Sequence, residues 1–324
     1  MIKVGLIGIG GMGGVHYNAY KMTSNCEVVA VADIREDMAR EKVGEDNVRV
    51  YHDMETLLAN EDVDFVDICT PSYMHTEMSI KALQSGVHVL SEKPMTLNTA
   101  DAMKIMDAAD KSGKLYMVAH VIRFAKPYMY LKDVIESGEL GKLVRLDMKR
   151  LSEKPLWSWE NWMMDEKKSG GAPIDLSIHD IDFVQSVFGM PDKINGVYNK
   201  MSRNGNDHIE AQLIYGDTII TTEGAWFDYK LPFEAGFTAI FQNGVLRLQG
   251  GKLTRNGEEV EFEKLLPKTE SGINISVDNA NVAEIEYFAD CVINGKAPEK
   301  VMPESSMKSI ELVEKIIENS TVLA

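Results

Sequence analysis

The chain opens with IKVGLIGIGGMG (residues 2–13), in which an apolar, strand-forming run leads directly into a cluster of glycines. A second apolar run, EVVAVAD (residues 27–33), ends in an acid. A strand, a glycine turn, a helix and a second strand that ends in an acid are typical of a dinucleotide-binding βαβ unit. In such a unit one glycine permits the tight turn, one lets a pyrophosphate approach, and one lets the helix pack closely. These roles fall on Gly8, Gly10 and Gly13.

Asp33 predicts which dinucleotide binds. It lies about twenty residues after the last glycine, where a carboxylate accepts hydrogen bonds from the adenosine ribose hydroxyls. The same charge would repel a 2′-phosphate, so NAD is the expected cofactor and NADP is less favoured. Arg35 leaves NADP open, because a guanidinium can bind a 2′-phosphate. The residues expected to contact the cofactor here are Gly8, Gly10, Gly11, Met12, Gly13, Asp33, Ile34 and Arg35.

Composition excludes several classes of partner. The chain has 324 residues, enough for two domains, and 44% of them are hydrophobic. A net charge of −16 argues against a nucleic-acid partner and an anionic membrane surface, which both require clustered basic residues. We see no signal peptide and no apolar run long enough to span a membrane, so a cytoplasmic location is expected. Three isolated cysteines without metal-ligand spacing are expected to be reduced thiols.

The first 120 residues alternate between strand and helix patterns, which predicts a doubly wound parallel α/β sheet. Strands are predicted at 2–7, 27–32, 64–69, 87–91 and 115–119, and helices at 13–22, 36–43, 73–85 and 99–112. Glycines at 86 and 113 stand where helix C-caps belong. We therefore predict a dinucleotide-binding domain over residues 1–120.

Residues 121–324 follow a different pattern. A helix over 127–137 precedes consecutive alternating segments separated by turn dipeptides, which indicates a large, mostly antiparallel open sheet in an α+β domain. The strands are predicted at 143–151, 207–215, 217–226, 235–241 and 244–249, and terminal helices at 280–293 and 303–320. Ligands are expected off the carboxyl ends of the first sheet, between the two domains.

Lys93 is the first candidate for catalysis. It stands in Ser91-Glu92-Lys93-Pro94, directly after a predicted strand, where its ammonium could hydrogen-bond a substrate hydroxyl. The alternative is a solvated surface lysine, the usual environment of this residue type.

The segment Gly170–Asp182 contains the second candidate group. Asp175 and His179 are four residues apart, hence on one face of a predicted helix, where a carboxylate can orient an imidazole for general-base work. Each residue is also common in purely structural roles, and Asp182 could be a structural partner. A metal site is not expected, because the helix supplies no second histidine at ligand spacing.

Four segments together resemble the glucose–fructose oxidoreductase/inositol dehydrogenase/MocA family: residues 8–13, 70–75, 86–94 and 170–182. The resemblance spans nearly the whole chain. It implies a Rossmann domain followed by an α+β domain whose open sheet mediates homodimers or homotetramers. It also implies hydride transfer between NAD(P) and a secondary alcohol of a sugar or cyclitol.

The resemblance also implies residue roles. Lys93 matches the lysine that contacts the reacting hydroxyl, and Asp175 and His179 match an orienting carboxylate and an acid/base. Thr70, Pro71 and His75 match the loop at the nicotinamide end, and Glu92 matches a cofactor-side position. Arg123 falls near the substrate in family members.

Tryptophans before the Gly170–Asp182 segment are candidate substrate contacts, because an aromatic face suits the C–H side of a sugar ring. Trp157 and Trp162 are the two favoured, and core packing or an oligomer interface is the competing explanation. Two other functions stay open. One is a nucleotide-sugar dehydrogenase, or an isomerase or hydrolase that retains NAD; the other is a non-catalytic dinucleotide-binding sensor.

Overall fold

The computed structural model describes residues 1–200, 206–262 and 279–323, and these group into two compact units. The first unit contains residues 1–121 together with 279–307, and the second contains the described residues from 122 to 262 together with 308–323. Each unit is built on its own sheet. Chain order alone places everything beyond residue 120 in the second part, whereas the segment 279–307 groups with the first unit.

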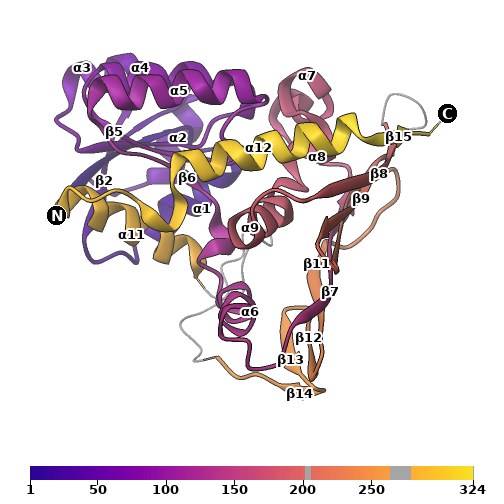
Figure 1. Cartoon of the computed structure of the whole chain (residues 1–324). Helices are drawn as coiled ribbons and strands as arrows, with labels where there is room; N and C mark the ends of the chain where they lie inside the picture. The colour runs from indigo at the N-terminus through magenta and orange to yellow at the C-terminus, as the bar shows by residue number, and fades with distance from the viewer. Residues whose placement is uncertain (201–205, 263–278, 324) are drawn as a thin grey trace. The chain divides into compact units, whose positions relative to one another are not determined.

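The first unit contains a six-stranded sheet in the order β3-β2-β1-β4-β5-β6, with every neighbouring pair parallel (Figure 1). Its strands are β1 (Ile2–Ile7), β2 (Cys26–Ala32), β3 (Arg49–Tyr51), β4 (Phe65–Ile68), β5 (His88–Glu92) and β6 (Tyr116–Ala119). The order reverses between β1 and β4, the point at which doubly wound sheets bind ligands at their carboxyl ends. The predicted parallel α/β sheet is confirmed.

The helices of this unit are α1 (Gly11–Tyr20), α2 (Glu36–Val43), α3 (Met54–Asn60), α4 (His75–Gln84), α5 (Thr99–Ser112) and α11 (Ala280–Asn294), with 3-10 turns η1 (Ser72–Met74) and η4 (Glu299–Val301). Helix α11 lies beside α1, and α4 lies beside α5 (Figure 1). The prediction missed β3 and α3, because a three-residue strand and a seven-residue helix are too short for a periodic pattern.

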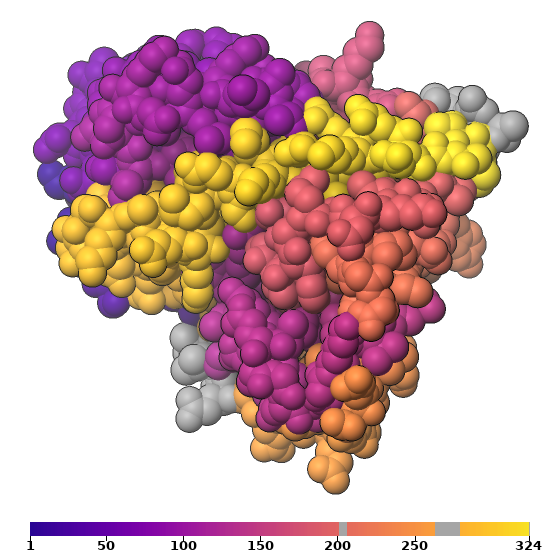
Figure 2. Space-filling model, viewed as in Figure 1, coloured from indigo at the N-terminus to yellow at the C-terminus, as the bar shows by residue number. Residues whose placement is uncertain are grey.

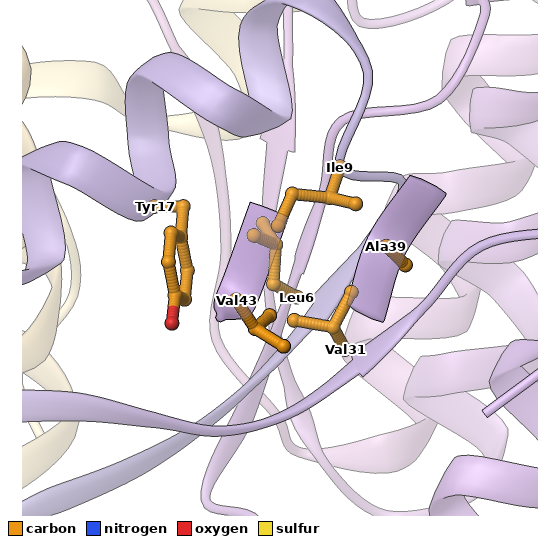
Figure 3. Close-up of a cluster of buried hydrophobic side chains, with 6 residues drawn as sticks. All are labelled: Leu6, Ile9, Tyr17, Val31, Ala39 and Val43. Carbon is orange, nitrogen blue, oxygen red and sulfur yellow. The ribbon is translucent and has the colours of Figure 1, made fainter. Parts of the chain in front are cut away.

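A hydrophobic cluster attaches the glycine turn to the core of this unit (Figure 3). Its buried members come from β1, β2, α1, α2 and the turn itself: Leu6, Ile9, Tyr17, Val31, Ala39 and Val43. Ile9 lies inside the turn and is completely buried. Burial of this one side chain therefore holds the backbone of the glycine turn against the core of the unit.

The second unit contains a nine-stranded sheet in the order β14-β13-β12-β11-β7-β10-β9-β8-β15. Its strands are β7 (Leu143–Glu153), β8 (Lys193–Asn199), β9 (Asp207–Tyr215), β10 (Thr218–Phe227), β11 (Glu234–Phe241), β12 (Gly244–Gln249), β13 (Lys252–Arg255), β14 (Glu258–Glu259) and β15 (Ser320–Val322). The β10–β7 and β15–β8 pairs are parallel and the others antiparallel, so the predicted mostly antiparallel sheet is confirmed. The prediction missed β8, which contains glycine and asparagine, residues that are depleted in strands.

The helices of this unit lie on one side of its sheet (Figure 1). They are α6 (Lys126–Ser137), α7 (Glu166–Ser169), α8 (Gly171–Asp175) and α9 (Ile178–Phe188), with 3-10 turns η2 (Val121–Arg123) and η3 (Trp159–Met164). Helix α12 (Pro303–Glu318) runs from the first unit into the second. On the other side of the sheet, Ile219 and Ile240 both pair with Arg145 and are 40% and 41% exposed.

No helix within the described ranges is both long and apolar enough to cross a membrane.

Candidate functional site

The glycine turn joins β1 to α1, and two of its glycines are required by close packing. Gly8 has a φ of +83°, and a Cβ there would lie 2.9 Å from the Cys69 carbonyl oxygen. A Cβ on Gly13 would lie 1.9 Å from the Gly8 carbonyl oxygen, which only a missing side chain avoids. Around Gly10, by contrast, the Arg35 guanidinium is the one group among the described residues outside the turn and its helix that comes within 4 Å of such a Cβ, at 3.5 Å. The turn is therefore closely packed at Gly8 and Gly13 and has space beside Gly10, where a pyrophosphate would have to approach the backbone.

Asp33 lies at the end of β2 and connects that strand to the glycine turn. Its Oδ2 accepts a hydrogen bond from the Ile9 backbone N–H at 3.0 Å, and its Oδ1 accepts one from the Arg35 backbone N–H at 2.9 Å. The Arg35 guanidinium also donates to Oδ1, from Nε at 3.2 Å. The structure thus brings together the turn, the acid and the arginine that the sequence pattern assigned to the cofactor.

Lys42, which sequence reasoning missed, contacts the same turn from α2. Its Nζ donates hydrogen bonds to the carbonyl oxygens of Ile9 and Gly10, both at 2.7 Å. Burial and the nearby Arg35 charge lower the pKa of Lys42, although the Asp33 charge opposes this. The Lys42 ammonium thus donates to two carbonyl oxygens that would otherwise be hydrogen-bonded to water. It also adds a positive charge beside the glycine turn. No local pattern marks this lysine, because its role depends on where α2 is packed.

His75 connects the two loops expected at the nicotinamide end. Its Nδ1 lies 2.8 Å from the Pro94 carbonyl oxygen, and its Nε2 lies 2.9 Å from the Thr70 carbonyl oxygen. The ring is buried, which lowers the pKa of His75 despite these two contacts. His75 thereby holds the Thr70-Pro71 loop, after β4, against the turn that follows β5.

Lys93 follows the last residue of β5, and its backbone is held by its neighbour. The Glu92 Oε2 accepts a hydrogen bond from the Lys93 backbone N–H at 3.0 Å, and Glu92 is buried. The other Glu92 oxygen, Oε1, lies 3.0 Å from Nε2 of His16, a residue of α1. Glu92 in this structure is therefore a bridge inside the first unit, and His16 is a second residue that sequence reasoning missed.

The structure corrects the single helix predicted for Asp175 and His179. Asp175 ends α8, and His179 lies in the first turn of α9, with Leu176 and Ser177 between the two helices. The break arises because the Ser177 backbone N–H bonds the Ala172 carbonyl, five residues back, at 2.8 Å. Asp175 and His179 are both buried, at 6% exposure. Their spacing is thus set by a helix junction and not by regular helical geometry.

Arg123 lies in a buried ion pair with Asp182. Its Nε and Nη2 donate to the two carboxylate oxygens at 2.8 and 2.6 Å, a bidentate arrangement. Ser309 of α12 donates a further hydrogen bond to Asp182 at 2.8 Å. Asp182 is therefore the structural partner that its position in the sequence allowed, and part of the Arg123 guanidinium is occupied by it.

The two tryptophans differ in environment. Trp162 is partly buried and packs against the hydrophobic cluster of Met163, Ala172, Leu176 and Trp226. Trp157 is 64% exposed, so its aromatic face is available to a ligand. Packing accounts for Trp162, and Trp157 keeps its candidacy as a substrate contact.

The strand order, the glycine turn and the placement of Asp33 define a dinucleotide-binding Rossmann domain. Residues 2–120 match the model of an oxidoreductase family with an NAD-binding Rossmann fold, and residues 128–247 match the GFO/IDH/MocA C-terminal domain. The chain belongs to the Gfo/Idh/MocA family, and its first unit is an NAD-binding domain.

Similar proteins differ in what they act on. The chain is 30% identical over 193 residues to a myo-inositol 2-dehydrogenase of Thermotoga maritima, covering 58% of this chain and 55% of that protein. It is 29% identical over 201 residues to a 2,7-anhydro-N-acetylneuraminate hydratase of Mediterraneibacter gnavus, covering 62% and 53%. The aligned region thus spans about half the length of these curated relatives.

The fold is shared with the WlbA dehydrogenase of Bordetella pertussis, solved in complex with NADH and UDP-GlcNAcA. The TM-score is 0.82 at 20% identity, covering 98% of this chain and 95% of that one.

Proposed function

We propose that this protein is an enzyme that transfers a hydride between NAD and a secondary alcohol or ketone of a sugar or cyclitol. One observation carries the cofactor half of the proposal: the Asp33 carboxylate is held by the Ile9 N–H beside a turn that is open at Gly10. This is where the two ribose hydroxyls of an NAD adenosine would bind.

The catalytic half of the proposal assigns three residues. NAD, when bound, supplies the hydride acceptor at its nicotinamide ring. The His179 imidazole removes the proton from the substrate hydroxyl, and Asp175 orients that imidazole. The Lys93 ammonium donates a hydrogen bond to the same oxygen and stabilises the negative charge that develops on it. Neither role needs a metal ion.

The substrate class is supported by one side chain and by the relatives. Trp157 presents an exposed aromatic face, which suits the C–H face of a sugar or cyclitol ring. The Thermotoga maritima relative is named for an inositol. We therefore expect a polyhydroxylated ring as substrate.

The test is turnover with a panel of inositols, aldoses, amino sugars and UDP-sugars, with NAD or NADP, followed at 340 nm. We expect NAD reduction by one class of polyol. In single-turnover measurements at neutral pH, Lys93→Met and His179→Ala should each slow hydride transfer by about 100- to 10,000-fold. The matched controls are Lys104→Met and His208→Ala, a lysine and a histidine that form ion pairs elsewhere. An unchanged hydride rate in His179→Ala would refute its assignment.

A second candidate is a reaction in which NAD stays bound and is regenerated in each cycle. It is favoured by the similarity to a hydratase, because a hydration changes no net oxidation state. Heat-released nucleotide from freshly purified protein, quantified by chromatography, distinguishes the two. About one equivalent of retained NAD(H) without net reduction of added NAD would favour this candidate. Ordinary NADH binding with no turnover of any kind would instead favour the sensor.

A further inference from the structure

The first unit contains a buried cluster of ionisable side chains that the proposed chemistry does not use. His16 of α1 and Asp67 of β4 are both completely buried, and Glu92 of β5 is nearly so. Glu284 of α11 is also completely buried, although the outer side of its helix forms part of the gold surface in Figure 2. Four ionisable groups without solvent must neutralise one another or change their protonation.

The contacts of the His16 ring determine its charge. Nδ1 is hydrogen-bonded to Asp67 Oδ2 at 2.8 Å, and Nε2 lies at ion-pair distance from Glu92 Oε1, 3.0 Å, without the geometry of a regular hydrogen bond. A neutral imidazole has a single N–H, so a carboxylate beside each nitrogen favours the ring that carries a proton on both. Burial is the largest single influence and acts to lower the pKa of His16, but the charges and hydrogen bonds of Asp67 and Cys69 together raise it well above its ordinary value. A doubly protonated ring also offers no lone pair to a metal ion.

The Glu92 carboxyl group beside the ring favours its ionised form. Burial alone would raise the pKa of Glu92, but the close contact with the His16 ring and its charge lower it below its ordinary value. Asp67 accepts a second hydrogen bond, from the Tyr20 hydroxyl at 2.9 Å. Glu284 behaves differently, because burial and the charges of Glu92 and Asp67 raise its pKa well above the ordinary value, although His16 opposes this. Within the cluster, the pKa shifts therefore favour a charged His16, an ionised Glu92 and a neutral Glu284.

The Glu92 carboxylate connects this cluster to Lys93. One oxygen faces the His16 ring, and the other accepts the hydrogen bond from the Lys93 backbone N–H. Both Glu92 oxygens therefore have a contact. The His16 ring orients the Glu92 carboxylate, and that carboxylate fixes the backbone position of Lys93. Other titratable groups interact with Glu92. The charged forms of Lys93 and His75 favour its ionised form, and its own charge raises the pKa of Cys69 and of Glu284.

We propose that His16 is a positioning residue: its ring, with a proton on each nitrogen, holds Glu92 so that this carboxylate fixes the backbone of Lys93. The inference rests on the proposed role of Lys93 in hydride transfer. Helix α1 would then have two functions. Its first residues belong to the glycine turn, and its His16 side chain holds the backbone at Lys93 through Glu92.

Nitrogen NMR of the 15N-histidine-labelled protein tests the charge state without any turnover. We expect His16 to keep both ring protons through the range near pH 6.5 in which an exposed histidine loses one. His88 is the internal control, since its Nδ1 accepts a hydrogen bond from the Leu115 N–H and burial lowers its pKa. A neutral His16 ring at pH 7 would overturn the proposal.

Kinetics test the connection to Lys93. His16→Gln and Glu92→Gln should each lower kcat by about 10- to 100-fold while changing NADH affinity by less than about threefold, as expected when a reacting group is displaced slightly. The double variant should lose no more than the worse single variant, because both act through one linkage. If the kcat losses of the two single variants multiplied in the double variant, the proposed linkage through Glu92 would be overturned. His88→Gln, at a half-buried histidine at the other end of β5, should leave kcat unchanged.

Two further measurements keep the result interpretable. If His16→Gln does not fold, His16→Gln/Asp67→Asn removes one of the two carboxylates that have lost the ring and should show the same loss of kcat. The Lys93 amide resonance of 15N-lysine-labelled protein should shift in His16→Gln, whether or not the wild type turns over any alcohol. A shifted Lys93 resonance in a protein that turns over no alcohol would support the positioning role of His16 and refute the proposed function. An unchanged resonance would refute the positioning role.

Discussion

The Arg35 guanidinium lies against the Asp33 carboxylate, with Nε 3.2 Å from Oδ1, and it also covers the open side of Gly10. The arginine side chain is 38% exposed and the aspartate only 5%. A group bound at the adenosine ribose therefore meets an acid already paired with a cation, and the balance between the two decides how strictly the site prefers NAD.

Removal of this acid should change the cofactor preference. Asp33→Ser deletes the charge that repels a 2′-phosphate and releases Arg35 to bind one. We expect the ratio of kcat/KM with NAD to kcat/KM with NADP to fall by about 100-fold, equivalent to about 3 kcal/mol of like-charge repulsion. Asp37→Ser, an exposed acid in the first turn of α2, should leave the ratio unchanged. An unaltered ratio in Asp33→Ser would show that Asp33 does not discriminate.

Lys42 should matter for both cofactors equally. Lys42→Met leaves the Ile9 and Gly10 carbonyls without their shared donor, so the glycine turn loses its support. We expect NADH and NADPH to bind about 10- to 100-fold more weakly, the range for losing charged hydrogen bonds, as measured by nucleotide fluorescence. Arg40→Met, which removes an exposed ion pair on the same helix, is the control. A loss confined to NADPH would mean that Lys42 reads the 2′-position instead.

Glu284 gives a pH-dependent prediction for stability. Its pKa is raised in the folded state, so its contribution is fully present below its ordinary pKa, near 4.3, and is lost as pH rises toward the folded value. Glu284→Gln, which keeps the shape of the neutral acid, removes this loss. The variant should therefore gain stability over the wild type as pH rises from 5 to 8, with a limiting slope of about 1.4 kcal/mol per pH unit.

Urea unfolding at several pH values measures this difference. A constant offset across the range would show that Glu284 is ionised in the folded protein. Glu286→Gln, on the same helix, is the matched control; its carboxylate accepts hydrogen bonds from the exposed Ser24.

The Arg123–Asp182 pair should dominate the stability of its surroundings. Asp182→Asn leaves a buried guanidinium without its carboxylate, which typically costs about 3–5 kcal/mol. Asp147→Asn breaks a solvent-exposed pair with Arg145 in the same unit and should cost less than about 1 kcal/mol. Denaturant unfolding compares the two. Equal and small effects would mean that the Arg123 guanidinium is held by other contacts and is available to a substrate.

We predict that the side of the nine-stranded sheet opposite its helices is an oligomer interface. Ile219→Asp places a charge on this side, beside Arg145, which separates Ile219 from Ile240. It should shift a dimer or tetramer toward monomer in light scattering after size exclusion. Ile293→Asp, at an exposed site on α11, should leave the mass unchanged. A wild-type monomer would refute the interface directly.

Sequence alone was sufficient where the determining interactions are local. The turn from Gly8 to Gly13, the acid at Asp33 and the hairpin turn at Gly216-Asp217 depend on backbone conformations that a few neighbouring residues impose. Strands and helices with a clear apolar period were predicted to within a few residues, because burial of one face follows directly from that period.

Other features of the site depend on residues that are far apart in the sequence, and only the tertiary structure determines them. The break between Asp175 and His179 occurs where Ser177 meets Gly224, so close that a Cβ on that glycine would lie 1.8 Å from the serine hydroxyl. Lys42 acquires its role only when α2 packs beside the glycine turn, and His16 acquires its charge only when β4 and β5 bring carboxylates to both ring nitrogens. Electrostatic and packing terms of this kind depend on distances through space, which no local pattern in the sequence encodes.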